Sequence, residues 1–176
     1  MALVDLKTYI PESKAVYDMR YGTDNNILGK VLQPDYPTQI DEAVADRLVL
    51  ISNDLAKKSL VLVFWDLWRP RDVHRQLLDF NDDPMSVNPN SPHLYGAAVD
   101  GTLAVAGSLE LLDMGTEYDD FTKKAWPGYP DLTQTQRQNR DLHTEVFARY
   151  GFSQWPTEWF HMTFDKLAEE PPTTIS

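Results

Sequence analysis

The sequence has 176 residues, of which 42% are hydrophobic and 24% charged, and this length and composition fit one soluble domain spanning residues 1–176. Its 16 basic and 27 acidic side chains give a formal net charge of −11, which argues against nucleic acid as a partner, because phosphate binding needs clustered Lys and Arg. The chain has no cysteine, so thiolate metal sites are excluded and any metal must be held by His, Asp or Glu.

The first third of the chain predicts an arm followed by a helix. Residues 1–39 contain scattered prolines, glycines and aromatic residues, which predicts an ordered arm that wraps the core rather than a regular element. A helix is expected over 38–58, with Thr38 and Asp41 as an acidic version of a capping box. Apolar residues at helical spacing form one stripe along this helix: Val44, Leu48, Ile51 and Leu55.

The next segment predicts a strand, a sharp corner and a second helix. The apolar run Leu60–Trp65 is typical of a strand covered on both faces, and we take it as the central strand of a sheet. Pro70 biases Arg69 toward extended geometry and suits the first position of a helix, so Asp66–Arg69 lies at a strand-to-helix corner. The Asn- and Pro-rich stretch 81–92 predicts a loop.

The second half of the chain alternates loops with regular elements. A strand is expected over 97–104 and a long loop over 113–132, which suits a lid or the wall of a site. Residues 134–150 predict a helix, with Thr133 and Gln136 forming its capping box.

A last strand is expected over 159–164, and the tail 169–176 is expected to fray. Helices and strands interleave irregularly and no glycine-rich phosphate loop is present, so a doubly wound nucleotide-binding fold is disfavoured. The sequence predicts an α+β domain, a single compact unit with a small, mainly antiparallel sheet flanked by helices.

The four histidines fall into two kinds of context. His74 and His143 lie on predicted helices, where a structural or surface role is expected. His93 lies in a loop, and small residues before Asp100 allow the backbone to bend tightly and bring both side chains together. His161 lies in the last, aromatic strand. Two imidazoles and one carboxylate are the protein ligands of a catalytic zinc site, and these residues can supply that set.

Two further side chains could complete a hydrolytic site. Glu158 could take a proton from water near the metal and pass it to a leaving amine. Residues three apart on a regular strand point to opposite faces, so Glu158 can act with His161 only if it lies in the turn after Pro156 or in a bulge. Arg69 could steady an oxyanion or a substrate carboxylate by forked hydrogen bonds, the alternative being a surface ion pair.

Three motifs occur in order along the chain. Trp65–Pro70 reads W-D-L-W-R-P, Ser91–Asp100 reads S-x-H-x-x-G-x-A-x-D, and Glu158–His161 reads E-x-x-H. Together they resemble the D-alanyl-D-alanine dipeptidases, zinc enzymes within the wider group of Hedgehog-like D,D-peptidases. Tyr21–Asn26 and Met114–Asp119 resemble two further segments of that family, so the resemblance extends over nearly the whole chain.

The resemblance implies a Hedgehog/D,D-peptidase-like fold and zinc-dependent hydrolysis of D-alanyl-D-alanine, a cell-wall dipeptide, to two D-alanines. Position by position, it implies that His93, Asp100 and His161 hold one zinc ion per chain. It also implies that Glu158 is the general base and acid, and that Arg69 stabilises the tetrahedral oxyanion.

The resemblance also implies a small pocket for the dipeptide. Asp119 matches the acidic residue that binds the free ammonium group of the substrate, and Tyr21 and Ser91 match positions that line the pocket. The chain departs from the family pattern at several positions near these motifs, which bears on the pocket's shape. They are Gly22, Ile27, Leu67, Trp68, Leu94 and Tyr95.

Two alternatives stay open at this point. The closer one is a related D,D-carboxypeptidase or endopeptidase that trims peptidoglycan peptides with the same metal site in an open cleft. The other, from a different class, is a binding domain that retains zinc without turnover, as occurs among Hedgehog-like domains. The presence of both Glu158 and Arg69 argues against the binding domain, because a structural zinc needs neither.

The sequence also predicts where the protein works. No stretch approaches the roughly 20 consecutive apolar residues that span a bilayer. The first residues lack a basic region followed by an apolar region, which a secretory signal needs. We therefore expect no membrane insertion and a cytoplasmic location, with an exported, periplasmic form as the alternative if a signal has been removed.

Overall fold

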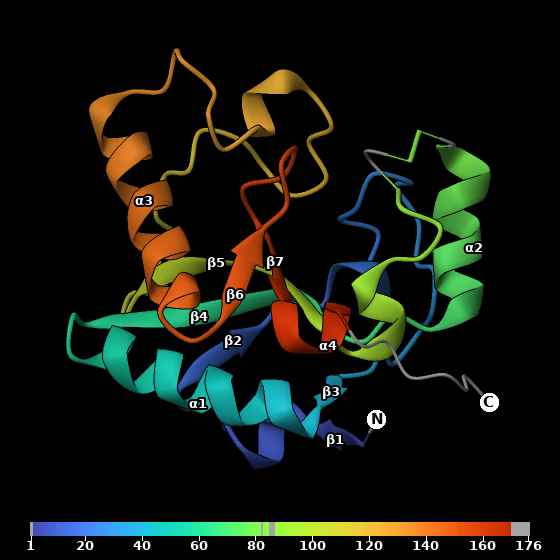
Figure 1. Ribbon diagram of the computed structural model, residues 1–176, viewed down its shortest axis with the longest axis horizontal. Helices are drawn as coiled ribbons and strands as arrows, with labels where there is room; N and C mark the ends of the chain where they lie inside the picture. The colour runs from blue at the N-terminus through green and yellow to red at the C-terminus, as the bar shows by residue number, and fades with distance from the viewer. Residues whose placement is uncertain (1, 82, 85–86, 170–176) are drawn as a thin grey trace.

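A five-stranded mixed sheet runs through the middle of the molecule, for which the computed structural model describes residues 2–81, 83–84 and 87–169 (Figure 1). In spatial order the strands are β2 (Ala15–Tyr17), β4 (Leu60–Asp66), β5 (Ala98–Val105), β7 (His161–Phe164) and β6 (Phe152–Gln154). β2 and β4 are parallel, and the other neighbouring pairs are antiparallel. The predicted single α+β domain with a mainly antiparallel sheet is confirmed.

Four α-helices flank this sheet within the described part of the chain: α1 (Glu42–Ala56), α2 (Arg71–Phe80), α3 (Gln134–Ala148) and α4 (Asp165–Glu169). α1 packs against β4, and α3 packs against β6 and α1 (Figure 1). The predicted apolar stripe of α1 faces the core, since all four of its side chains are fully buried: Val44, Leu48, Ile51 and Leu55. Among the described helices, none has the length and apolar character needed to cross a membrane.

The α3 helix begins as its sequence predicts. The side chain of Thr133 accepts a hydrogen bond from the backbone N–H of Gln136, and the Gln136 side chain accepts one from the backbone N–H of Thr133. This reciprocal pairing satisfies two backbone donors that would otherwise lack partners at the start of the helix. The loop over 113–132 is irregular as predicted, apart from the short 3₁₀ turn η4 (Lys123–Ala125).

The arm over 1–39 is more regular than predicted. Within it, β1 (Leu3–Asp5) pairs antiparallel with β3 (Gln39–Asp41), and β2 adds a parallel strand to the edge of the main sheet beside β4. Each strand is only three residues long, too short to show a periodic pattern. The prediction of an arm without regular elements is therefore wrong, because long-range pairing rather than local pattern forms these strands.

The first helix starts later than predicted. It begins at Glu42, and Asp41 caps it by accepting a hydrogen bond from the backbone N–H of Ala43. The predicted capping box at Thr38 is wrong. The Thr38 hydroxyl instead donates to the Asp5 carboxylate, 2.7 Å away, because the residues after Thr38 pair with β1 before the helix begins.

β5, rather than β4, is the central strand of the sheet. β4 is an interior strand, buried along nearly all its length as predicted. On its outer side it has only β2, whereas β5 has two strands on each side, β4 and β2 on one and β7 and β6 on the other. An apolar run shows that a strand is covered on both faces and says nothing of how many strands lie on each side.

Smaller differences occur at element ends. Pro70 is the N-cap of α2 and not its first residue. No sequence signal predicts α4, which takes up Glu169, and the rest of the predicted tail, 170–176, lies outside the described residues. In the predicted loop over 81–92, residues 82, 85 and 86 also lie outside them.

Gly101 in β5 allows β4 to lie close to the strand that supplies Asp100. A Cβ atom added at Gly101 would overlap the backbone carbonyl oxygen of Val63 in β4. A backbone atom cannot turn away as a flexible side chain can, so any larger residue here must push the two strands apart.

We predict that Gly101→Ala lowers the free energy of unfolding by about 1–3 kcal/mol, the usual cost of overpacking. Denaturant unfolding followed by tryptophan fluorescence measures this value. Gly128→Ala is the matched control, because Gly128 is exposed, has an ordinary φ and has no atom within 4 Å of an added Cβ. Equal stabilities of the two variants would contradict the prediction.

Candidate metal centre and active site

Two strands and one turn place the predicted metal ligands. Asp100 and His161 are directly opposite each other on the antiparallel strands β5 and β7. His93 lies in the 3₁₀ turn η3 (Pro92–Tyr95), where the Ser91 hydroxyl accepts a hydrogen bond from its backbone N–H. Gly96 ends this turn with φ +66°, a left-handed conformation that glycine adopts at little cost, and the chain then enters β5.

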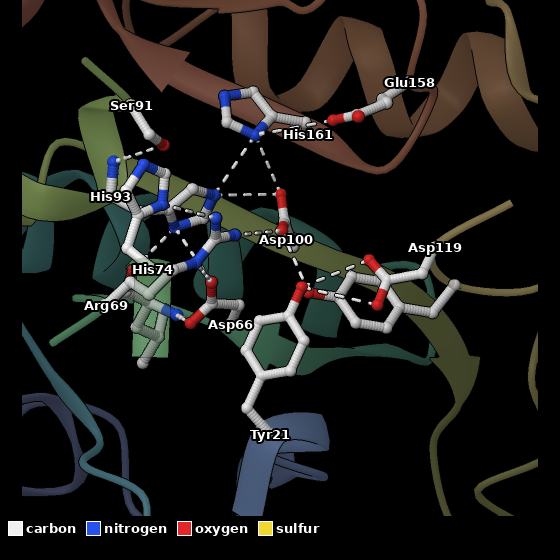
Figure 2. A network of polar contacts seen from close by, with 12 residues as sticks. Tyr21, Asp66, Arg69, His74, Ser91, His93, Asp100, Asp119, Glu158 and His161 are labelled. Atoms are coloured by element: carbon white, nitrogen blue, oxygen red, sulfur yellow. Dashed lines mark hydrogen bonds and ion pairs between the residues drawn. The ribbon is translucent and has the colours of Figure 1, made fainter. Parts of the chain in front are cut away.

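The three side chains meet in one buried cluster (Figure 2). His93 Nε2 and His161 Nδ1 lie 3.1 Å apart, and they lie 3.1 and 2.9 Å from Asp100 Oδ1. Ligand atoms bound tetrahedrally to zinc at about 2.0–2.1 Å are about 3.3 Å from one another. The cluster therefore has the donor types and the size of a zinc ligand set.

The outer nitrogen of each imidazole is hydrogen-bonded away from the cluster. His93 Nδ1 lies 2.6 Å from the carbonyl oxygen of Leu67, which can only accept, so this nitrogen carries the proton. His161 Nε2 lies 2.9 Å from the hydroxyl of Thr163, which can accept in the same way. Both rings can thus direct a lone pair toward Asp100, which is the arrangement that metal-ligating histidines adopt.

Asp100 is a carboxylate prepared to stay charged. Its Oδ1 atom is buried and has no hydrogen-bond partner within the described residues, although both imidazoles lie close to it. Burial opposes its ionisation, but the positive charge that His93 and His161 carry when protonated outweighs that effect and holds the pKa of Asp100 well below its ordinary value. A bound cation would supply that positive charge when both rings are neutral. A buried anion with unfilled acceptor capacity is what a bound cation would satisfy.

Glu158 meets the geometric condition that its spacing from His161 imposes. β7 begins at His161 and not at Trp159 as predicted, and Glu158 lies just before it, in the turn that follows Pro156. Its Oε2 atom is 3.9 Å from His161 Nδ1. Burial, together with repulsion from Asp100, raises the pKa of Glu158 well above its ordinary value, which favours the protonated form of the group.

Arg69 is buried and not in a surface ion pair. Its Nε donates to Asp66 Oδ2 at 2.7 Å, and a terminal nitrogen, NH2, lies 3.6 Å from Asp100 Oδ2. The guanidinium also lies over the ring of Tyr21, 5.3 Å from its centroid. Asp66 is in turn fixed by the hydroxyl of Tyr36, which donates to its other oxygen at 2.8 Å.

A further acidic group, Asp119, lies across the cavity (Figure 2). Asp119 is buried, and both its oxygens accept from the Tyr21 hydroxyl, at 3.2 and 3.3 Å. Burial and the nearby Asp100 raise the pKa of Asp119 to about 7. A cationic group placed beside it would reverse that shift and be bound in return.

One cavity connects all these groups. Every one of the eight predicted site residues lines it: Tyr21, Arg69, Ser91, His93, Asp100, Asp119, Glu158 and His161. The positions that depart from the family pattern do not line it, among them Leu94 and Tyr95 beside His93. The expectation that these bulkier residues reshape the pocket directly is therefore not supported by the lining of the cavity.

A family model described as D-ala-D-ala dipeptidase, peptidase M15, matches residues 1–173. The chain belongs to this family. It is 26% identical to the D-alanyl-D-alanine dipeptidase of Escherichia coli (strain K12) over 172 residues, which cover 96% of this chain and 88% of that protein. It is 24% identical to the enzyme of the same name from Enterococcus faecium over 178 residues, with 88% of this chain and 87% of that protein covered.

Membership in the peptidase M15 family makes the protein an enzyme of the metallopeptidase class. The resemblance predicted from the three motifs is confirmed. Zinc dependence is general in this family, and the cluster of His93, Asp100 and His161 is the candidate metal site of this M15 member.

Some residues of this site were not singled out from the sequence. Asp66 lies within the first motif, and its role follows only from its contact with Arg69. Thr163 lies two residues after His161 and hence on the same face of β7, a signal that could have identified it. Tyr118, whose hydroxyl donates to Asp100 Oδ2 at 3.3 Å, is adjacent to Asp119 in the sequence.

The two histidines given a structural or surface role differ in the structure. His143 is buried against Phe147 and Trp159, in agreement with a structural role. His74 is also buried, but its Nδ1 lies 3.4 Å from a terminal nitrogen of Arg69, NH1.

We predict that the purified protein contains one zinc ion per chain. Asp100→Asn should weaken zinc binding by more than about 100-fold, which exceeds the usual effect of removing a residue that only hydrogen-bonds to a ligand. An amide is a poorer ligand and gives the zinc ion no negative charge to bind. Metal analysis after dialysis against a chelator series measures the affinity. Asp131→Asn, an exposed carboxylate in the loop before α3, is the control. Equal zinc affinity in both variants would remove Asp100 from the site.

Proposed function

We propose that the protein hydrolyses the dipeptide D-alanyl-D-alanine to two D-alanines in a zinc-dependent reaction. The convergence of His93, Asp100 and His161 within 3.1 Å of one another is the observation that supports this most strongly. The family match, and the relatives named D-alanyl-D-alanine dipeptidase, support the choice of substrate.

His93, Asp100 and His161 would hold the metal, and the hydrogen bonds to Leu67 and Thr163 favour the tautomers this requires. Zinc bound there would polarise the scissile carbonyl as a Lewis acid and lower the pKa of a water molecule to about 7.

Glu158 moves the proton in this proposal. Its Oε2 accepts a proton from the attacking water, whose oxygen bonds to the peptide carbon, and gives that proton to the nitrogen as the carbon–nitrogen bond breaks. Its raised pKa favours the protonated form, in which the group carries the proton until it passes to the nitrogen. Its position 3.9 Å from His161 Nδ1 places it beside the ligand cluster.

Arg69 stabilises the carbonyl oxygen as negative charge develops on it. Its NH2 group faces Asp100 at the cavity, and its Nε is bound to Asp66, so the positive charge is both buried and fixed in direction. Because the side chain is buried, solvent screens this charge little, and an aligned donor contributes most in such surroundings.

Asp119 binds the free ammonium group of the dipeptide. A buried carboxylate whose pKa is raised to about 7 gains stability when a cation comes beside it, which favours a substrate with an unblocked amino end. Tyr21 holds both oxygens of Asp119, and Ser91 lines the cavity wall near His93.

We predict that Glu158→Gln lowers kcat for D-alanyl-D-alanine by several orders of magnitude, because the amide cannot take up a proton. Zinc content should stay at the wild-type level, since Glu158 is not among the three ligands. Glu145→Gln, on the exposed face of α3, is the matched control and should keep full activity. Released D-alanine and metal content are measured on the same samples, and undiminished turnover in Glu158→Gln would exclude it as the base.

We predict that the kcat/KM for N-acetyl-D-alanyl-D-alanine is lower than that for the free dipeptide by at least about 100-fold. The reason is that losing one partner of a buried ion pair costs about 3–5 kcal/mol. A peptidoglycan pentapeptide should be an equally poor substrate. Asp119→Asn should narrow the difference between free and acetylated dipeptide. Cleavage of the blocked substrates at the same rate as the free one would instead favour a carboxypeptidase.

A further inference from the structure

The guanidinium of Arg69 contacts three different partners along its edges (Figure 2). Nε donates to Asp66 Oδ2 at 2.7 Å, and NH2 lies 3.6 Å from Asp100 Oδ2. The remaining nitrogen, NH1, lies 3.4 Å from Nδ1 of His74. Asp100 is a candidate metal ligand and Asp66 already fixes Nε in the proposed function, whereas His74 has no role in it.

The contact with Arg69 defines the state of the His74 ring. A guanidinium has only donors, so His74 Nδ1 must offer a lone pair and the ring proton must lie on Nε2. The imidazole is therefore neutral, since a second ring proton would point at an N–H of Arg69. Burial and the charge of Arg69 lower the pKa of His74 to about 4, in accord with this geometry.

α2 holds His74 at a fixed place relative to Arg69. His74 is 3% exposed, and its backbone N–H bonds to the carbonyl of Pro70 in the first turn of the helix. Val73 and Leu77, its neighbours on α2, are also buried, so this side of the helix faces the interior. His74 follows Arg69 by five residues, across the strand-to-helix corner, and its ring contacts the guanidinium of Arg69.

We propose that His74 is a positioning residue, which fixes the guanidinium of Arg69 so that its NH2 edge faces the cavity. This proposal rests on the proposed function, in which that edge stabilises the reacting carbonyl oxygen. Asp66 holds Nε, the Tyr21 ring lies against the face of the guanidinium, and Asp100 is 3.6 Å from NH2, but none of these contacts holds NH1. The contact with His74 at NH1 adds a second fixed point at the edge of the fork and so helps to set the direction of NH2.

A neutral acceptor suits this position better than a carboxylate. Arg69 already faces Asp66 and Asp100, and a further negative charge would offset more of the positive charge that the carbonyl oxygen is to meet. His74 supplies direction without supplying charge.

The test compares two substitutions of His74 in the zinc-loaded protein. His74→Leu removes the acceptor, and His74→Asn keeps an acceptor oxygen in the place of Nδ1. We expect His74→Leu to lower kcat for D-alanyl-D-alanine about 10- to 100-fold, the range for a hydrogen bond to a charged group, with KM and zinc content changed less than about twofold. His74→Asn should recover most of kcat. Equal losses in both variants, or no loss in His74→Leu, would overturn the proposal.

A matched control and a double variant separate positioning from packing. His143 is equally buried, and neither of its ring nitrogens has a hydrogen-bond partner among the described residues, so His143→Leu should leave kcat unchanged. In an Arg69→Lys background, adding His74→Leu should lower kcat by less than about a further twofold, because the guanidinium that His74 positions is gone. The same fold-loss with and without Arg69 would show that His74 acts through packing and would overturn the proposal.

One measurement needs neither turnover nor a variant. Nitrogen-15 NMR of the zinc-loaded wild-type protein should show His74 Nδ1 without a proton and Nε2 with one. A protonated Nδ1 would overturn the proposal even if every His74 variant failed to fold. Absence of D-alanyl-D-alanine hydrolysis by the wild type would instead overturn the proposed function, and the NMR result distinguishes that failure from a failure of the His74 assignment.

Discussion

The close approach of three buried metal-binding atoms is the constraint on which the rest of the site depends. Two imidazole nitrogens and a carboxylate oxygen lie 2.9–3.1 Å apart in the core, and the outer hydrogen bonds of the two rings turn lone pairs toward the shared space. Such an arrangement is costly unless a cation fills it. The pairing of β5 with β7 and the tight turn at Gly96 hold the three ligand atoms together against this cost. The sheet therefore positions the site as well as forming part of the core.

The charge balance of the site leads to the same conclusion. Three buried carboxylates line the cavity, Asp100, Asp119 and Glu158, and a fourth, Asp66, is bound to Arg69, whose guanidinium is the one that lines it within the described residues. The uneven balance appears as raised pKa values for Asp119 and Glu158, which burial and the charge of Asp100 bring about. A divalent ion and the ammonium group of a dipeptide are the two positive charges that would restore the balance.

Local signals in the sequence predicted the elements that local forces determine. The α3 capping box, the buried strand β4 and the corner before α2 need only neighbouring residues, and all three are present. β1 and β3 escaped prediction because they exist only through pairing between residues almost forty positions apart. The same holds for the site. The positions of the motifs indicated the candidate metal-binding and catalytic side chains, but the contacts of Asp66 and His74 with Arg69 depend on where α2 starts relative to β4.

The site takes its parts from almost the full length of the chain. Tyr21 comes from the arm, Arg69 and His93 from the middle, and His161 from β7, the last strand in chain order within the described residues. During synthesis on the ribosome, a growing chain therefore holds His93 and Asp100 without their third companion. In the proposed mechanism, which needs all three ligands, the nascent polypeptide cannot cut peptides until β7 has emerged and docked, so catalytic competence arrives abruptly, at a late moment of biogenesis.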